Sequence, residues 1–343
     1  MPLGCHVLGG VNFLLWLVCN YFLIGLGMHS VGIDIGGTKI AGALVDDAGN
    51  IVEELRVPSP ITDPGDMVDA IARVIGNLTE GKKVVGVGVA AAGFLSADRE
   101  IMFHSPNIAA WRNEPLKSRI QEKTSYPVLL ENDANAAGWA EFRFGAGQNV
   151  SSMIMLTIGT GVGGAVVTEG RLLKGGFGIG GELGHVVSIP GGRDCGCGLK
   201  GCIETYASGT ALLQAARNLA ESNDRLGSGL RELNSDPTAL TGEQVYQAIM
   251  EDDPGALGLI SELGEHLGIA IGSLFVPVLD PELVVIGGGV SAVGERLLEP
   301  MRVGYSRSLP AMGYRPELSI VKAQFLNQAG LIGAADLARQ SFS

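Results

Sequence analysis

Apolar residues along this chain form short runs typical of buried strands and longer stretches with helical spacing. Strands are predicted at 31–37, 40–45, 84–89, 128–130, 153–158, 162–167 and 281–286. Apolar residues recur every three or four positions in the predicted helices, at 66–78, 116–124, 134–144, 210–220, 242–250, 256–275 and 328–339. Strands that alternate with helices predict an α/β fold. The polar, glycine-containing segment 222–236 is interpreted as a surface loop.

Three glycine-rich turns each follow an apolar strand, at Gly36-Gly37-Thr38, Gly159-Thr160-Gly161 and Gly287-Gly288-Gly289. Such turns expose backbone N–H groups that suit phosphate oxygens, although a single one is also an ordinary hairpin turn. The sequences GGTKIAGALV (36–45) and GTGVGGAVV (159–167) are alike, which indicates an internal duplication. There is no GxxxxGK[ST] motif, and the first two turns open hairpins rather than helices. Neither a P-loop nor a dinucleotide fingerprint is therefore predicted.

Two acidic positions follow predicted strands. Asp34 lies just before the first glycine turn, and a carboxylate beside a phosphate loop indicates Mg²⁺ bound through water. The alternative is the capped end of a strand. Asn132-Asp133 lies between a strand and a helix, where a carboxylate can accept a proton from a hydroxyl nucleophile. Plain helix capping explains this pair equally well.

A histidine and three cysteines form the series His-x9-Cys-x-Cys-x4-Cys, which is a closed tetrahedral ligand set for a structural Zn²⁺. The ligands are His185, Cys195, Cys197 and Cys202. A redox disulfide is the weaker alternative, because a C-x-C pair is poorly spaced for a bridge. Zinc would fix a loop that carries Glu182 and Glu204, whose carboxylates suit sugar hydroxyls. Each glutamate taken alone is better explained as a solvated surface charge.

Composition narrows the class of protein. The chain has 343 residues, 46% hydrophobic and 17% charged, which is enough for a large core in one or two domains. The net charge of -12 disfavours nucleic-acid partners, because an acidic chain repels phosphate backbones. Five cysteines in this length are too few for a secreted disulfide scaffold. We expect a cytoplasmic protein.

Residues 1–28 form an apolar N-terminal extension, in which the run from Gly9 to Leu26 approaches the length that crosses a bilayer. A signal peptide is disfavoured because residues 1–27 contain no Lys or Arg and no obvious small-residue cleavage site. Three interpretations stay open: upstream sequence translated ahead of a start at Met28, a membrane anchor, or a buried accessory helix. We expect the first, and a membrane role only if the extension is native.

Together these features resemble the ROK family of sugar kinases and sugar-responsive repressors, from about residue 30 to residue 340. The resemblance rests on DIGGTK (34–39), ENDANAA (131–137), GTGVGG (159–164), GELGH (181–185), CGCGLKGCIE (195–204) and VVIGGGV (284–290). Within the family, SPNIAAWRNEPL (105–116) and NQAGLIGAADLAR (327–339) are similar to bacterial, actinobacterial-type glucokinases.

The resemblance implies a duplicated actin/hexokinase-like (ribonuclease H-like) fold with the active site in a cleft between two α/β domains. One domain would be residues 29–133, completed by the C-terminal helix at 327–343, and the other would be 134–326 with the zinc loop. The implied reaction is ATP-dependent phosphorylation of D-glucose to glucose 6-phosphate with Mg²⁺, and Asp133 as the general base on the 6-hydroxyl. A homodimer or homotetramer is also implied.

The resemblance further implies which residues bind each substrate. The sugar pocket would contain Gly93, Asn107, Asn132, Asp133, Glu182, His185 and Glu204. The first phosphate loop would be Asp34, Gly36, Gly37, Thr38 and Lys39, the second Thr160, Gly161, Gly163 and Gly164, and the adenosine side Gly287, Gly288 and Gly289. One ring nitrogen of His185 would bind zinc and the other would face the sugar. Ala92-Gly93 stands where relatives often carry Pro-Gly, which leaves the details of that loop open.

Two other functions stay open. One is a kinase for another hexose, such as N-acylmannosamine, mannose or fructose, because pocket shape sets sugar specificity. The other is a non-catalytic ROK sugar-sensing regulator, which would need a DNA-binding helix-turn-helix ahead of DIGGTK. Residues 1–27 lack Lys and Arg, so no basic recognition helix is predicted there. The sequence also leaves polyphosphate open as a substitute for ATP.

Overall fold

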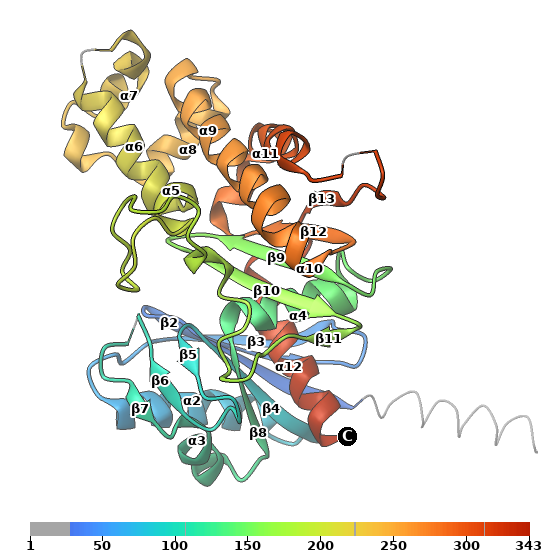
Figure 1. Ribbon diagram of the computed structural model, residues 1–343. Coiled ribbons are helices and arrows are strands. Elements are labelled where there is room, and N and C mark those ends of the chain that lie inside the picture. The colour runs from blue at the N-terminus through green and yellow to red at the C-terminus, as the bar shows by residue number, and fades with distance from the viewer. Residues whose placement is uncertain (1–27, 107, 223, 312) are drawn as a thin grey trace, which may run out of the picture.

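The computed structural model describes residues 28–106, 108–222, 224–311 and 313–343. Within these ranges, two five-stranded sheets lie one above the other in Figure 1, each accompanied by helices. The expectations for residues 1–27 and for Asn107 fall outside the described residues.

The first sheet has the strand order β3-β2-β1-β4-β8. Its strands are β1 (His29–Ile35), β2 (Lys39–Val45), β3 (Ile51–Pro58), β4 (Val84–Ala91) and β8 (Val128–Asn132). β1, β2 and β3 are antiparallel neighbours, whereas β1, β4 and β8 run parallel. The carboxyl ends of the three parallel strands therefore meet at one edge of the sheet.

The second sheet repeats this plan, with the order β11-β10-β9-β12-β13. Its strands are β9 (Met153–Ile158), β10 (Val162–Thr168), β11 (Arg171–Leu172), β12 (Leu283–Gly287) and β13 (Ser319–Lys322). β9, β10 and β11 are again antiparallel neighbours, and β9, β12 and β13 again run parallel. The common order and directions confirm the duplication that was predicted from the two glycine turns.

Helices cover both faces of the first sheet. α2 (Pro64–Thr79) begins at the N-cap Asp63, and its buried side chains share a core with Val31 and Ile33 of β1. α3 (Leu116–Thr124) joins the same core. The last helix, α12 (Ala329–Phe342), packs on the other face, against β1 and β4. A small third sheet of β5 (Phe94–Leu95), β6 (Met102–His104) and β7 (Arg112–Glu114) lies in the same part of the molecule.

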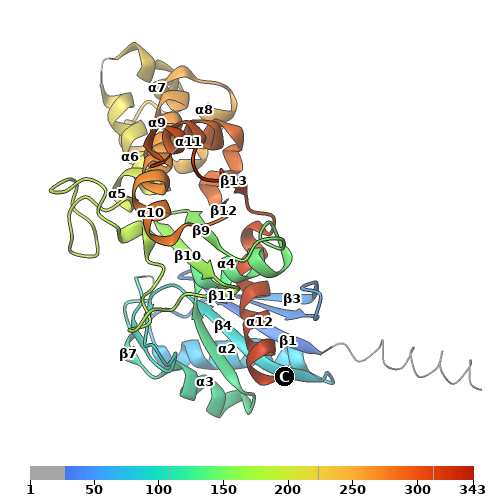
Figure 2. The same ribbon diagram turned by 45° about the vertical axis from the view of Figure 1, so that its right-hand side comes forward.

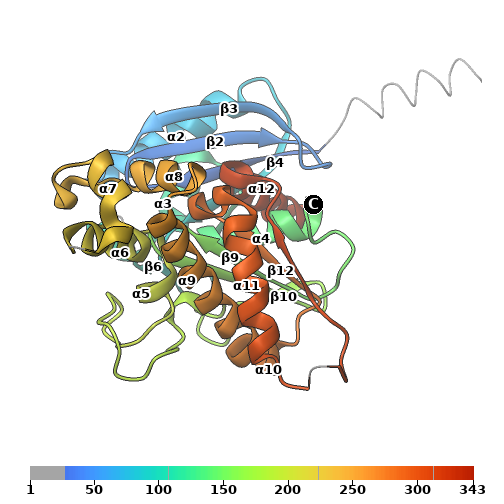
Figure 3. The same cartoon turned by 90° about the horizontal axis from the view of Figure 1, so that it is seen from above.

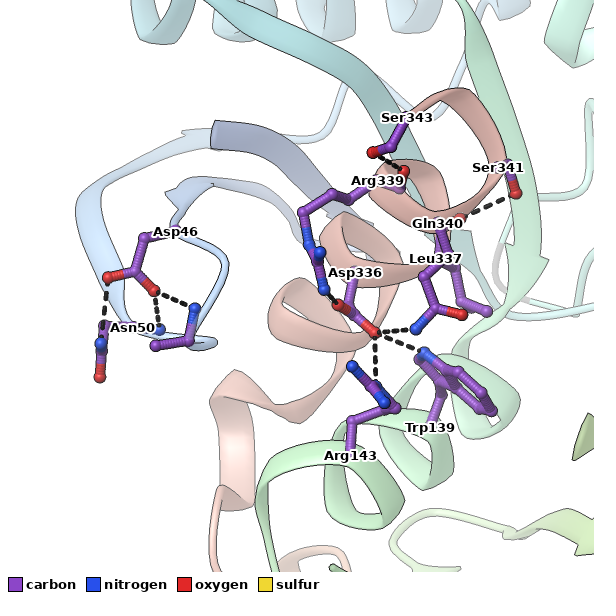
Figure 4. Close-up of polar contacts among 11 residues, drawn as sticks. Asp46, Asn50, Trp139, Arg143, Asp336, Leu337, Arg339, Gln340, Ser341 and Ser343 are labelled. Carbon is purple, nitrogen blue, oxygen red and sulfur yellow. Dashed lines mark hydrogen bonds and ion pairs between the residues drawn. The ribbon is translucent and has the colours of Figure 1, made fainter. Parts of the chain in front are cut away.

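α4 (Asp133–Phe144) and α12 lie side by side and are joined through a buried carboxylate (Figure 4). The side chain of Asp336 accepts hydrogen bonds from Trp139 Nε1 at 2.9 Å and from Arg143 Nε at 3.2 Å. It also accepts from Gln340 Nε2 at 2.8 Å and pairs with Arg339. A buried charge with this many donors is well satisfied, so it fixes α12 on α4.

The helices of the second half are α5 (Glu204–Ala207), α6 (Gly209–Glu221), α7 (Ser228–Leu233), α8 (Gly242–Met250), α9 (Pro254–Ala270), α10 (Val276–Leu279) and α11 (Glu295–Ser308). Figure 3 shows α9 and α11 side by side. Among the described residues, one helical segment, Pro254–Leu279, is long and apolar enough to cross a membrane. More than half of its apolar window is buried, and Ile260, Leu263 and Leu267 belong to the core of the second half, as in a core helix.

The interpretation of 222–236 as a surface loop is wrong. The segment contains a 3₁₀ turn at Arg225–Gly227 and the helix α7. Leu230 is fully buried and Leu233 packs beside it, so this short helix contributes to the core. Leu230 and Leu233 have helical spacing, but the residues around them are mostly polar, so the segment was interpreted as a loop. Strands β3 and β13 and helix α11 were also not anticipated.

Candidate active site

Two aspartates meet at the edge of the first sheet where β1, β4 and β8 end. Asp34 stands near the end of β1, and Asp133 is the first residue of α4, directly after β8. Burial and the negative charge of Asp133 raise the pKa of Asp34 to about 6, although Lys39 acts in the opposite direction. Burial also raises the pKa of Asp133, partly offset by the backbone N–H groups that open α4. The structure thus brings together Asp34, which is predicted to bind Mg²⁺, and Asp133, which is predicted to be the general base.

Glu182, from the second half, lies close enough to Asp133 for their charges to interact, and Glu204 lies near Glu182. Burial, followed by the charges of Asp133 and Glu204, raises the pKa of Glu182 to about 7. Both glutamates are half-buried, so neither is the solvated surface charge that sequence reasoning left open. Carboxylates this close repel one another, and sugar hydroxyls or a cation would relieve that repulsion.

Asn132 is the cap of α4. Its Oδ1 accepts a hydrogen bond from Asn135 N at 3.1 Å, while its Nδ2 donates to Gly93 O at 3.2 Å. The cap role therefore belongs to Asn132, and the side chain of Asp133 is not needed for it. The same contact fixes Gly93, in the turn after β4, beside the start of the helix.

The four predicted metal ligands come together. The ligand atoms of His185, Cys195, Cys197 and Cys202 all lie within 4.8 Å of one another. Nδ1 of His185 is 3.6 Å from Cys195 Sγ, and the sulfurs of Cys197 and Cys202 are 3.7 Å apart. A tetrahedral site with metal–sulfur bonds of about 2.3 Å separates two sulfurs by about 3.8 Å. The cluster therefore fits a bound metal ion, and the three cysteines are free rather than disulfide-bonded.

Glu204 joins this cysteine loop to the second glycine turn. Its Oε2 accepts a hydrogen bond from Val162 N at 2.9 Å, and its Oε1 lies 4.0 Å from Cys195 Sγ. A Cβ at Gly161 would overlap with the carboxylate of Glu204, so a larger residue there would displace this carboxylate. The loop that carries the sugar-site candidates is thus fixed directly to a phosphate-site candidate. Gly163 and Gly164 follow in β10.

The first two glycine turns close hairpins, as predicted. Gly36 N donates to Lys39 O at 3.0 Å, and the last residues that pair between β1 and β2 are Ile35 and Ile40, so four residues separate this pair. Gly159 N donates to Gly161 O at 3.0 Å, so the turn between β9 and β10 has only the three residues 159–161. Their contact with phosphate stays a prediction.

The third glycine turn lies beside the second, because Gly287 of β12 pairs with Thr157 of β9. Its bend is stabilised by Ser291 Oγ, which donates to Gly288 O at 2.7 Å.

An apolar cavity of about 120 Å³ adjoins these two turns, and sequence reasoning missed it. It is lined by Gly209, Leu212, Leu213, Gly242, Val245, Tyr246, Ile249, Gly289, Val290 and Val293. Gly209 N donates to Gly159 O at 2.7 Å, which ties the cavity wall to the second turn. The helical spacing of its apolar residues is the same as in ordinary core helices, so the sequence did not distinguish residues that line a cavity from residues that fill the core.

Sequence reasoning also missed a charged cluster directly before Asp133. Glu131 is fully buried in β8, where it faces Arg99 and Lys174. A single glutamate at the end of the apolar run VLLEN was the available signal.

Comparison with known proteins agrees with this fold and this set of residues. Residues 30–341 match the model of the ROK family, and the chain belongs to that family. A glucokinase of Streptomyces coelicolor is 40% identical over 312 residues, which cover 91% of this chain and 98% of the relative. An N-acetylmannosamine kinase of Citrobacter koseri is 33% identical over 317 residues, covering 91% and 99%.

Among solved structures, a ROK family glucokinase from Streptomyces griseus, in complex with glucose and AMPPNP, superposes with a TM-score of 0.81. It is 40% identical, and the match covers 91% of this chain and 99% of that one. The predicted duplicated actin/hexokinase-like fold is confirmed by these neighbours and by the two matching sheets.

Proposed function

We propose that this chain is an ATP-dependent glucokinase, which transfers the γ-phosphoryl group of ATP to the 6-hydroxyl of D-glucose. The observation that carries the proposal is the carboxylate of Asp133, held at the start of α4 near Asp34 and Glu182, with Glu204 near Glu182. The glucokinase relatives, at 40% identity over nearly their whole length, support glucose as the acceptor.

Asp133 would act as the general base. It would accept the proton of the 6-hydroxyl as that oxygen forms its bond to the γ-phosphorus, while the bond to the β-phosphate oxygen breaks and ADP leaves. The raised pKa of Asp133 makes its carboxylate a stronger base than an exposed aspartate. The transition state of phosphoryl transfer is loose, so alignment by the surrounding residues supplies most of the rate increase.

Glucose hydroxyls would be bound by Asn132, Glu182, His185 and Glu204, with Gly93 and Asn107 lining the pocket. Nδ1 of His185 faces Cys195 Sγ, which leaves its Nε2 for a sugar hydroxyl. A zinc ion held by His185, Cys195, Cys197 and Cys202 would supply a rigid anchor for the loop and no catalytic water, since all four positions are filled.

ATP phosphates would lie between the turns at Asp34–Lys39 and Thr160–Gly164, with Gly287, Gly288 and Gly289 on the adenosine side. The apolar cavity beside Gly289 suits a purine ring. Asp34 fits a Mg²⁺ ion bound through water, because burial and Asp133 destabilise its charge in the metal-free protein. That ion would neutralise charge on the phosphates.

The proposal includes the organisation of the chain. Residues 29–133 with the helix at 327–343 would form one domain, and residues 134–326 the other. The packing of α12 against β1 and β4 supports this division. Closure of the two domains would exclude water, which otherwise competes with the sugar as acceptor. A cytoplasmic homodimer or homotetramer completes the proposal.

The test is a coupled assay that follows ADP release from Mg-ATP with glucose, mannose, fructose, N-acetylmannosamine or no sugar. Glucose is expected to give the highest kcat/KM. The N-acetylmannosamine kinase relative makes that sugar the second candidate, and a preference for it would retain the mechanism but change the substrate. Absence of turnover with every sugar, from protein that still binds sugar, would reject the kinase and favour a sensor. Polyphosphate in place of ATP tests the alternative phosphoryl donor.

A further inference from the structure

The segment between β11 and Glu182, residues 173–181, crosses from the second sheet to the first and is here called the strap (Figures 1 and 2). At its centre, buried Gly178 rests on the turn after β5. A Cβ at this position would lie 2.6 Å from Leu95 O and 2.8 Å from Ala97 N. The φ of +87° at Gly178 also excludes most other residues. The strap is therefore docked on the first half at a position where only glycine fits.

The side chain of Arg99 bonds to the backbone of the docked strap. Its side chain is 6% exposed, and its NH1 donates to Gly178 O at 2.7 Å and to Ser96 O at 3.3 Å. Its NH2 lies 2.8 Å from Glu131 Oε1. One guanidinium thus links the strap backbone to a buried carboxylate through two different nitrogens, and the single nitrogen of an ammonium group cannot occupy both positions.

Glu131 connects that link to the proposed catalytic residue. Its Oε1 also accepts hydrogen bonds from Asn132 N at 3.0 Å and from Asn135 Nδ2 at 3.1 Å, on both sides of Asp133. Its Oε2 lies 3.3 Å from Lys174 Nζ, so a cation that belongs to the strap itself also reaches this carboxylate. The peptide that carries Asp133 and the strap that leads to Glu182 therefore share one buried anchor.

Buried ion pairs are an inefficient way to stabilise a fold, because desolvation offsets most of their attraction. A buried pair that bridges two parts of an active site is better explained by the geometry that it fixes than by the stability that it adds to the fold. We propose that Arg99, Glu131 and Lys174 are positioning residues, which hold the strap and thereby Glu182 against Asp133 so that the sugar pocket is assembled before glucose binds. This inference rests on the proposed glucokinase function.

The experiment compares two conservative substitutions. Arg99→Lys keeps a positive charge beside Glu131 but has one nitrogen in place of the two that contact Glu131 and the strap backbone. Arg339→Lys is the matched control, because Arg339 pairs with buried Asp336 on α12 and forms no hydrogen bond or ion pair with the strap among the described residues. We expect Arg99→Lys to raise the glucose KM roughly tenfold, with a smaller fall in kcat and an unchanged ATP KM. Arg339→Lys should lower the thermal midpoint while the glucose KM stays at the wild-type value.

Equal glucose KM values in wild type and Arg99→Lys would overturn the proposal, and so would an equal rise in the control. If Arg99→Lys does not fold, Lys174→Met replaces it, because Lys174 is partly exposed and its loss removes only the second anchor. A smaller rise in glucose KM is then expected, and no rise would contradict the proposal.

Hydrogen exchange separates this proposal from the proposed function. Amides of residues 174–181 should exchange faster in Arg99→Lys than in wild type, and should be unchanged in Arg339→Lys. That measurement needs no turnover, so a wild-type protein that phosphorylates no sugar would reject the kinase while the anchoring is still tested. Unchanged exchange in Arg99→Lys would reject the anchoring.

Discussion

The two five-stranded sheets have the same strand order and directions, but their parallel strands end in different chemistry. In the first sheet, β1 ends near Asp34 and β8 leads into Asp133. At the corresponding places in the second sheet stand Thr157, near the end of β9, and Ala323, after β13. The duplicated frame thus has acidic residues at these two positions in one copy and uncharged residues, Thr157 and Ala323, in the other.

This difference suits the two substrates. Acidic strand ends favour a hydroxyl that must lose a proton and a cation that must be held, whereas uncharged ends do not repel phosphate. Among the described residues of the second half, the acids proposed for the site, Glu182 and Glu204, flank the loop that carries the cysteines. Duplication supplied two platforms, and side chains at a few strand ends made them unlike.

The largest expected effect comes from removing the acid after β8. Asp133→Ala should lower kcat by about 10²–10⁴-fold, the range for loss of a general base, while glucose affinity changes less. Steady-state kinetics and direct glucose binding by calorimetry measure the two effects. Ala323→Ser, at the counterpart position, should leave kcat unchanged. Near wild-type turnover in Asp133→Ala would show that the two sheets do not differ in the way proposed.

The next effect concerns the acids that the second half supplies through its metal loop. Cys197→Ser should abolish stoichiometric zinc, as measured by elemental analysis, and should raise the glucose KM roughly tenfold because Glu204 and His185 lose their anchor. The ATP KM should change little. Full zinc content in the variant would refute the ligand set.

A smaller effect should appear in stability without Mg²⁺. The pKa of Asp34 is about 6 in the folded protein, against 3.8 for an unperturbed aspartate. Its stabilising contribution is therefore complete below pH 3.8 and is lost as the pH rises through 6. Asp34→Asn should unfold like wild type at pH 3.5 but be more stable by about 3 kcal/mol at pH 7.5 in urea titrations.

Thr157→Val is the control for Asp34→Asn, because its position in the second sheet is uncharged. The difference between this variant and wild type should be the same at both pH values. A pH-independent difference for Asp34→Asn would contradict the unfavourable charge assigned to the end of β1.

The smallest effect tests the uncharged side. Tyr246→Ala removes an aromatic wall of the apolar cavity beside Gly289. It should weaken binding of the adenine ring of ATP by about 1 kcal/mol, which corresponds to a roughly fivefold rise in the ATP KM. The glucose KM should not move. A rise in the glucose KM instead would place the sugar, rather than the nucleotide, in this cavity.

Patterns that are local in sequence predicted local structure well. Helix α8 has the predicted bounds, Gly242–Met250, because its apolar spacing and its cap at Thr241 lie within a few residues. The metal ligands were found for the same reason, since they fall within eighteen residues of one another along the chain.

Contacts between distant segments could not be predicted. Arg99 and Gly178 are 79 positions apart, and only the folded chain brings them together. The apolar cavity is built from α6, α8 and the third glycine turn, and the two helices carry no distinctive motif that would place them beside that turn. The prediction that α12 packs on the first sheet came only from the resemblance to a family, because nothing in the sequence of the helix indicates which sheet it covers.

The position of α12 has a consequence for synthesis on the ribosome. Ala41 and Ala43 of β2 are covered by Leu331 and Ala335 of α12, and Trp139 of α4 bonds to Asp336. About 200 residues are translated between Asp133 and α12, which takes roughly 10–40 s at bacterial speeds. Throughout that interval one face of the first sheet lacks its cover. The half of the protein that is made first is therefore finished last, and the nascent chain needs protection from aggregation until its final helix emerges.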